Sequence, residues 1–376
     1  MSKIYQALAI TLMFALPSVA QQQRWSEAKA NDWYAKQPWL VGVNYIPATA
    51  VNQLEMWQAD TFDAPQIDKE LGWAENTGIN MVRVFLPYIL WDKEPAEFQK
   101  RIDAFLTIAS KHHIRTMFVL FDSCFDPRPR LGPQHPPIPG VHNSAWVQSP
   151  GAVTLADPSQ YPRLKAYVQS VVGAFANDPR VLAWDIWNEP NNIFDPYAKF
   201  EAKDKIKIEQ ALLPQAFAWA RSANPTQPLT SATWKGNDWS SLDKVDPDER
   251  IQLEQSDILT FHNYSWPEEW EQRAQWLQGY HRPVICTEFM ARGLGNTFDA
   301  ILPLAKKDHV GVNAAAFVYG KVQSYLPWES WYHPYILQPP PIWFHDMFYP
   351  DGRPYRAAEI KLIRDLTGRP ETANTN

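Results

Sequence analysis

The stretch VLAWDIWNEP, residues 181–190, begins as a nearly continuous apolar run and ends in Asn188, Glu189 and Pro190. A short apolar run that closes on a turn signal is typical of a strand buried on both faces, as in a parallel sheet. Such a strand would carry an amide and a carboxyl group side by side at its carboxyl end. This pattern has two explanations. It is either a simple strand end followed by a turn, or it carries one of two carboxyl groups that react as an acid/base pair. A second carboxyl group elsewhere in the chain would decide between the two explanations.

The same succession of a short strand-like run and a longer helix-like segment repeats along the chain. Residues 96–113 place Phe98, Ile102 and Phe105 on one apolar stripe, which predicts a helix. Eight such units favour a closed (β/α)8 barrel of the α/β class, the TIM barrel, as a single domain with long βα loops. No glycine-rich phosphate loop follows the first run, which disfavours an open dinucleotide-binding sheet. The strand-like runs are 39–46, 81–88, 115–122, 181–188, 228–234, 257–264, 283–289 and 315–322.

Polar side chains gather where these predicted strands end, and in such a barrel the active site lies at the carboxyl ends of the strands. Two long connections, 123–160 and 323–353, leave the strands at the same end. Because both are rich in aromatic residues, we expect them to form the walls of a cleft rather than disordered segments. The polar residues at the strand ends are Asn44, Arg83, Asp122, Asn188, Glu189, His262, Tyr264 and Glu288.

Glu288 supplies the second carboxyl group, near the end of the run PVICTEF at 283–289. The period of two along a strand places Cys286 and Glu288 on one face, so we expect Cys286 in the core beneath Glu288. Cys124 lies on a different part of the predicted barrel, and we expect no disulfide between the two cysteines. The fourth and seventh strands of an eight-stranded barrel face each other, so Glu189 and Glu288 can reach one cleft.

The motifs Asn-Glu-Pro at 188–190 and Thr-Glu-Phe at 287–289 resemble those of the clan A glycoside hydrolases, most closely the family 5 cellulase and mannanase group. The resemblance covers nearly the whole mature chain, strand by strand. It implies a (β/α)8 barrel that hydrolyses β-glycosidic bonds of a carbohydrate substrate with retention of configuration. It also implies that the reaction needs neither a metal ion nor another cofactor.

The resemblance assigns a role to each matching residue. Glu189 corresponds to the general acid/base and Glu288 to the nucleophile. Asn188 corresponds to the amide that binds the sugar 2-hydroxyl, and Arg83 to the arginine that keeps the nucleophile ionised. His262 and Tyr264 correspond to the family's pair of residues at the sixth strand, beside the two carboxyl groups. Asn44 is a further candidate substrate contact.

The chain departs from the family pattern at two strand ends. The family usually has a histidine after the third strand, where this chain has Asp122. It usually has a tryptophan at the end of the eighth strand, where this chain has Lys321 near the expected tip. Trp328 or Trp331 in the following loop can replace that tryptophan as a platform for a sugar ring. Asp122 and Lys321 are candidate sugar contacts, and a local ion pair or a loop anchor explains them equally well.

The first residues predict export from the cell. Lys3 precedes an apolar run at 7–16, and small residues before Gln21 form a cleavage site, so we expect a signal peptide at residues 1–20 and a catalytic domain at 21–376. The apolar run is too short to span a bilayer, and we expect no membrane insertion. The mature protein is therefore expected in the periplasm or outside the cell, as a monomer.

The net charge of −6 argues against a nucleic-acid partner, which would require a basic face. Two alternatives to a hydrolase remain. A transglycosylase would use the same residues and pass the covalent intermediate to a sugar instead of water. A barrel that only binds carbohydrate would need neither Glu189 nor Glu288, so the presence of both favours an enzyme.

Overall fold

The computed structural model describes residues 23–370. Eight strands form one sheet in the order β5-β4-β3-β2-β1-β8-β7-β6, and all paired strands are parallel. A parallel bridge between Thr233 and Phe261 links the two ends, so the sheet is a nearly closed (β/α)8 barrel, as expected. The strands are β1 (Val41–Asn44), β2 (Met81–Phe85), β3 (Arg115–Asp122), β4 (Val181–Asn188), β5 (Leu229–Thr230), β6 (Leu259–His262), β7 (Val284–Phe289) and β8 (Gly311–Ala314).

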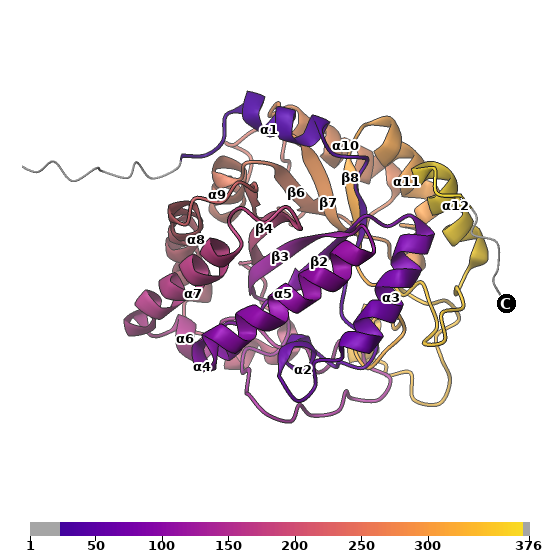
Figure 1. The fold of residues 1–376 in the computed structure, drawn as a ribbon, viewed down its shortest axis with the longest axis horizontal. Coiled ribbons are helices and arrows are strands. Elements are labelled where there is room, and N and C mark those ends of the chain that lie inside the picture. The colour runs from indigo at the N-terminus through magenta and orange to yellow at the C-terminus, as the bar shows by residue number, and fades with distance from the viewer. Residues whose placement is uncertain (1–22, 371–376) are drawn as a thin grey trace, which may run out of the picture.

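Helices surround the barrel (Figure 1). In α5 the predicted stripe of Phe98, Ile102 and Phe105 is fully buried against the strands, and burying each such side chain contributes about 1.5–3 kcal/mol. The longer helices are α1 (Glu27–Ala35), α3 (Ala64–Thr77), α5 (Pro95–Lys111), α7 (Tyr161–Ala174), α8 (Lys205–Ser222), α9 (Pro247–Gln255), α10 (Pro267–Gln278), α11 (Phe298–Lys307) and α12 (Ala357–Thr367). The shorter ones are α2 (Gln53–Trp57), α4 (Tyr88–Lys93) and α6 (Ala152–Leu155), with 3-10 turns η1 (Pro158–Gln160), η2 (Asp195–Phe200), η3 (Arg292–Leu294) and η4 (Trp328–Trp331).

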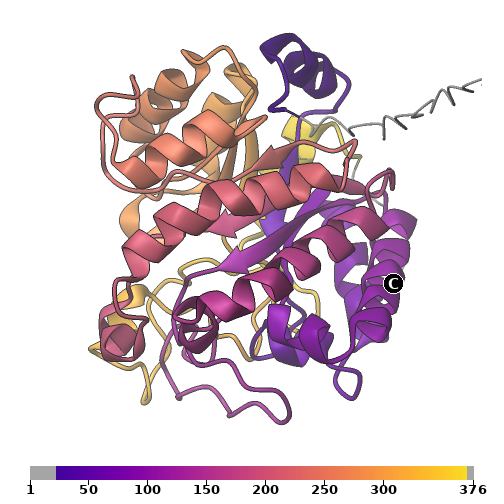
Figure 2. The same cartoon turned by 90° about the vertical axis from the view of Figure 1, so that its left-hand side faces the viewer.

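One end of the barrel is sealed and the other carries the loops. Trp25, just before α1, packs with Leu40, Met81 and Ile285 in a buried cluster at the amino ends of the strands. The long connections after β3 and β8 lie at the opposite end of the molecule from α1 (Figure 2). Any ligand therefore has access to the strands only from their carboxyl ends, where the polar residues were expected.

The eighth strand is displaced from its predicted position at 315–322. It spans Gly311–Ala314 and pairs with β1, where Val41 lies opposite Val312. A Cβ atom added at Gly311 would lie 3.1 Å from the side chain of Ile285, so the sheet accepts only a small residue there. Strand propensity penalises glycine and favours the aromatic residues further along, which is why the sequence pattern misplaced this strand.

The expected alternation along β7 is also interrupted. Cys286 is buried, as expected, but it faces α10, where the Trp270 indole nitrogen lies 3.2 Å from its sulfur. The pairing between β6 and β7 slips after Cys286, so that Glu288 lies opposite His262. β7 has one extra residue, Thr287, between the two paired positions, which is the pattern of a β-bulge. A bulge redirects the residues after it. Glu288 therefore reaches the barrel mouth although Cys286 points outward, and the prediction that they share a face is wrong.

Both cysteines are unbonded, as expected. The predicted signal peptide at residues 1–20 lies outside the described residues. Within residues 23–370, no helix combines the length and the apolar character needed to cross a membrane.

Candidate active site

Glu288 is surrounded by donors from β1, β2 and the loop after β6. Arg83 Nη1 and Asn44 Nδ2 each donate to Oε1 at 2.9 Å, and the Tyr264 hydroxyl donates to Oε2 at 2.6 Å. Burial alone would raise the pKa of Glu288. Electrostatic attraction to His262 and Arg83 and the hydrogen bonds from Tyr264 and Asn44 outweigh burial and lower its pKa to about 2. Glu288 is therefore an ionised carboxylate over the whole neutral range.

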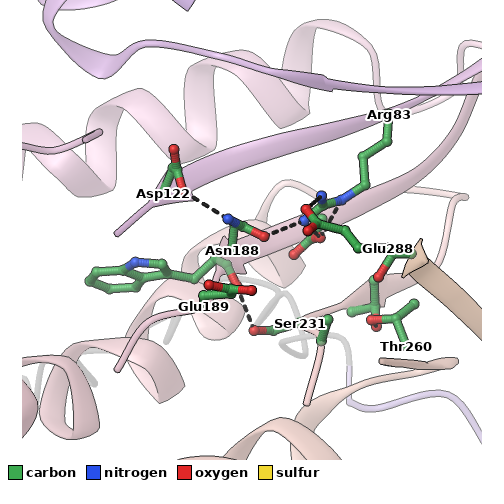
Figure 3. Close-up of polar contacts among 12 residues, drawn as sticks. Arg83, Asp122, Asn188, Glu189, Ser231, Thr260 and Glu288 are labelled. Atoms are coloured by element: carbon green, nitrogen blue, oxygen red, sulfur yellow. Dashed lines mark hydrogen bonds and ion pairs between the residues drawn. The ribbon is translucent and has the colours of Figure 1, made fainter. Parts of the chain in front are cut away.

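Arg83 is fully buried and does not line the cavity, so it acts on Glu288 and not as a sugar contact. Its Nη2 donates to Asp185 Oδ2 and to Asn188 Oδ1, both at 2.7 Å (Figure 3). Burial opposes its charge, but the carboxylates of Asp185 and Glu288 prevail and raise the pKa of Arg83. Sequence reasoning did not single out Asp185. A charged residue inside the apolar run VLAWDIW was the signal that could have identified it.

Glu189 has a different set of neighbours. His262 Nδ1 lies 2.8 Å from its Oε1, and Asn192 Nδ2 donates to its Oε2 at 2.6 Å. The Cys124 sulfur lies 3.3 Å from the same Oε2. Burial raises the pKa of the Cys124 thiol well above its usual value, so the thiol keeps its proton and donates it. Asn192 and Cys124 were not among the expected site residues.

The backbone at Glu189 is unusual for a residue with a side chain. Its φ is +45°, in the left-handed region that non-glycine residues seldom adopt. Such conformations cost of order 1–3 kcal/mol and cluster at functional sites. The turn that Pro190 closes thus holds the carboxyl group over the barrel mouth.

The two carboxyl groups are close together. One oxygen of Glu189, one oxygen of Glu288 and a ring nitrogen of His262 all lie within 4.8 Å of one another. A cation could bridge three such groups by distance alone. However, both oxygens of Glu288 already accept hydrogen bonds, and the Arg83 guanidinium at 2.9 Å would repel a second cation. The arrangement suits proton transfer and nucleophilic attack better than metal binding.

Asp122 is a positioning residue and does not contact the cavity, contrary to the prediction of a sugar contact. Its Oδ1 accepts from Asn188 Nδ2 at 2.8 Å (Figure 3). Its Oδ2 accepts from Trp146 Nε1 at 2.7 Å. Burial raises the pKa of Asp122 to about 6, although both hydrogen bonds oppose this shift. Asp122 accepts from the nitrogen of the Asn188 amide, and Arg83 donates to the oxygen of the same amide. The amide is therefore held in one orientation.

A cavity of about 600 Å³ opens above these groups. Lys321 lies outside it and forms an ion pair with Glu55 at 3.1 Å, so the predicted sugar contact is wrong and the local ion pair is right. The reason is that β8 ends earlier than expected, which leaves Ala315 and Ala316 at the strand tip. The expected residues that do line the cavity are Asn44, Asn188, Glu189, His262, Tyr264, Glu288 and Trp328.

Trp328 and Trp331 both line this cavity. They are the two loop tryptophans expected to replace the tryptophan that the family has at the eighth strand. Trp328 meets the ring of Tyr264 edge-on, with 5.0 Å between the ring centroids. Trp331 is stacked with Phe125 at 6.1 Å, and its buried Nε1 has no hydrogen-bond partner. A buried donor without a partner is costly unless a ligand satisfies it.

A (β/α)8 barrel that presents two closely spaced carboxyl groups at the carboxyl ends of β4 and β7 defines the protein as a glycosidase acting on O-glycosyl compounds. The family model Cellulase (glycosyl hydrolase family 5) matches residues 74–333, and the chain belongs to this family. It is a β-glycoside hydrolase. No curated protein matches the chain.

Solved structures with a similar fold are distant in sequence. An exo-beta-1,4-mannosidase from Opitutaceae bacterium strain TAV5 has 18% identity and a TM-score of 0.58, with 88% of this chain and 60% of that chain covered. A GH5_18 structure from Streptomyces cattleya in complex with GlcNAc has 13% identity and a TM-score of 0.59, covering 90% and 82%. A beta-mannanase from the blue mussel Mytilus edulis has 14% identity and a TM-score of 0.53, covering 76% and 87%.

Proposed function

We propose that the protein hydrolyses β-linked oligosaccharides by double displacement with retention of configuration. Glu288 is the nucleophile and Glu189 is the acid/base. The supporting observation is the short approach of the two carboxyl groups, since one oxygen of Glu189 lies within 4.8 Å of one oxygen of Glu288. Retaining glycosidases hold their carboxyl groups about 5–5.5 Å apart, whereas inverting ones leave about 6.5–9.5 Å for a water molecule.

The unequal surroundings of the two groups fit these roles. The carboxylate of Glu288 attacks the anomeric carbon, while the Glu189 carboxylic acid gives its proton to the departing glycosidic oxygen. Water then enters, Glu189 takes one of its protons, and the hydroxide displaces Glu288 from the sugar. The Arg83 charge at 2.9 Å suits a group that must stay ionised, and Glu189 has no arginine or lysine partner among the described residues.

The names of two similar structures support a substrate class to test first. The mussel and Opitutaceae proteins are a mannanase and a mannosidase by name, so β-mannosides are the first substrates to test. We further propose export through the signal peptide at residues 1–20. The mass of the mature protein secreted by a bacterial host would test this, since cleavage before Gln21 gives a defined amino terminus.

The experiment that tests the mechanism follows the configuration of the first product by proton NMR. Wild type, Glu288→Ala, Glu189→Ala and a surface control, Glu97→Gln, are assayed on aryl β-mannosides and β-glucosides. We expect the β-anomer to appear first, and we expect Glu288→Ala to lose at least about 10³-fold in kcat. Azide should rescue Glu288→Ala with an α-glycosyl azide and Glu189→Ala with a β-glycosyl azide. An α-anomer as first product from wild type would contradict retention.

A further inference from the structure

Two long loops are fastened to each other across the barrel mouth. We call residues 123–151 the β3 loop and residues 315–356 the β8 loop; both lie at the end opposite α1 (Figure 2). Gln323 Nε2 donates to the carbonyl oxygens of Ile138 at 2.8 Å and of Val141 at 3.0 Å. The backbone nitrogen of Gly140 donates back to Gln323 Oε1 at 3.2 Å. These three bonds form a loop clasp centred on one side chain.

Further contacts extend this seam. The backbone nitrogen of His142 donates to Ser330 Oγ at 2.9 Å, and that of Tyr335 donates to the Gly140 carbonyl at 2.9 Å. Gly140 has φ +73°, and a Cβ atom there would lie 2.6 Å from the Tyr335 backbone. The close approach of the two loops therefore depends on glycine at this position. Together the two loops form one continuous wall.

This wall makes the two sides of the cavity different. On the side of the loop clasp five lining residues are buried, and we call this side the closed half; Trp328, also in the β8 loop, lines the cavity and is 41% exposed. On the side of the β6 and β7 loops, Leu294 lines the cavity and is 43% exposed, and nearby Trp266 is 67% exposed; we call this side the open half. The closed half is lined by Phe85, His142, Trp146, Val322 and Ser324.

The catalytic groups fix which part of a substrate faces each half. Two of the three donors to Glu288, Asn44 on β1 and Arg83 on β2, lie next to the closed half, and the third, Tyr264, follows β6. Two of the three neighbours of Glu189, His262 on β6 and Asn192 after β4, come from the other side. The sugar attacked by Glu288 therefore faces the closed half, and the leaving group protonated by Glu189 faces the open half.

Two buried histidines line the cavity and offer hydrogen-bond acceptors, His142 in the closed half and His345 beside the residues that follow β7. His142 Nδ1 bonds the Leu326 carbonyl at 2.8 Å, and His345 Nδ1 bonds the Met290 carbonyl at 2.6 Å. Each Nδ1 must carry a proton to do so, which leaves each Nε2 as an acceptor. Burial lowers the pKa of His142 to about 3 and that of His345 to about 4, so both rings are neutral. Neutral imidazoles lining the cavity can accept from sugar hydroxyls.

We propose that the closed half holds one terminal sugar, so that the enzyme removes single units from the non-reducing end of a β-linked chain. This inference rests on the proposed function. A second sugar beyond the attacked one would have to pass through the wall of the β3 and β8 loops. The rest of the chain leaves as the aglycone over the open half.

The test uses β-1,4-linked mannose and glucose pentasaccharides that carry a fluorescent label at the reducing end. We expect the labelled tetrasaccharide as the first labelled product, with free monosaccharide, and no cleavage when the terminal 4-hydroxyl is methylated. Labelled disaccharide or trisaccharide at the earliest times, or cleavage of the capped chain, would overturn the inference while leaving the hydrolase intact. Absence of any turnover that depends on Glu288 would instead remove the proposed function, and this inference with it.

The loop clasp offers a second test. Gln323→Ala removes three hydrogen bonds from a residue outside the cavity lining, and we expect internal cleavage of the pentasaccharide to rise about tenfold as the wall opens. The matched control is Gln227→Ala. Gln227 also makes three hydrogen bonds between elements, to Phe175, Asp178 and Trp184. Purely terminal release by Gln323→Ala would contradict the role assigned to the wall.

Discussion

At the scale of single residues, the two carboxyl groups differ because different side chains surround them. Glu288 accepts from Arg83, Asn44 and Tyr264, whereas Glu189 meets a thiol and an amide. The sequence motifs identified both glutamates, since each follows a strand with a recognisable tip. They could not identify Cys124 or Asn192, because a half-buried thiol and a loop amide have no characteristic spacing.

The hydroxyl of Tyr264 provides a pH prediction. Attack requires ionised Glu288, whose lowered pKa of about 2 keeps activity high as the pH falls through the ordinary value near 4.5. Tyr264→Phe removes one stabilising hydrogen bond and so raises the pKa of Glu288 by about one unit. We expect the acid limb of kcat/KM to move to higher pH by that amount.

The control for this shift is Tyr161→Phe, which removes a hydroxyl that donates to the Leu155 carbonyl far from the site. Its pH profile should match wild type. An unchanged acid limb in Tyr264→Phe would show that this hydrogen bond does not set the ionisation of Glu288.

At the scale of elements, strand assignment succeeded where apolar runs were long and failed where packing demanded small residues. The runs at 115–122 and 181–188 match β3 and β4 residue for residue. Gly311–Ala314 was missed because its glycine fits the space beside Ile285, which only the folded barrel reveals. The bulge in β7 was missed for a similar reason, since it depends on pairing with β6.

Glycines test this view of strand packing. A Cβ atom at Gly42 in β1 would lie 2.8 Å from the Met81 carbonyl oxygen, so Gly42→Ala should destabilise the fold by about 1–3 kcal/mol. At Gly173 in α7 the nearest atom is Ala223 Cβ at 3.9 Å, and Gly173→Ala should stabilise by about 0.5–1 kcal/mol. Urea unfolding of both variants measures the two effects. Equal effects of the same sign would contradict the packing argument.

The loop after β6 carries a prediction about chain length. Trp266 is 67% exposed beside the open half, where its ring can stack on sugars of the leaving chain. Trp266→Ala should raise KM for a pentasaccharide by about three- to tenfold, because an aromatic contact contributes about 0.5–1.5 kcal/mol. The effect should shrink for a disaccharide. Tyr332→Ala is the control, since Tyr332 has the same exposure but belongs to the β8 loop and not to the open half. Equal changes in KM at every chain length would contradict a role in binding the leaving chain.

At the scale of the whole molecule, the barrel was predictable because eight repeated units leave few other arrangements. The shape of the cavity was not, because it depends on contacts between loops far apart in the sequence, such as Gln323 with Ile138. Such pairings leave no periodic pattern in either loop. The same loops contain a buried acid that couples the stability of the chain to pH.

That acid is Asp346 in the β8 loop, which is fully buried. Its Oδ1 accepts from Ser324 Oγ at 2.7 Å, and its Oδ2 has no hydrogen-bond partner. Burial raises the pKa of Asp346 to about 7, above its ordinary value of 3.8. The folded protein therefore holds a proton here that the unfolded chain loses, and stability from this group is lost as the pH rises through about 7.

Asp346→Asn removes this titration and keeps an oxygen that can accept from Ser324. Relative to wild type, we expect the variant to gain about 2 kcal/mol in free energy of unfolding between pH 5 and pH 8. Urea unfolding at both pH values measures this, with Asp351→Asn as the control at an exposed position. A constant difference between Asp346→Asn and wild type would mean that Asp346 is ionised in the folded protein throughout. The wall around the closed half would then contain a buried negative charge rather than a neutral acid.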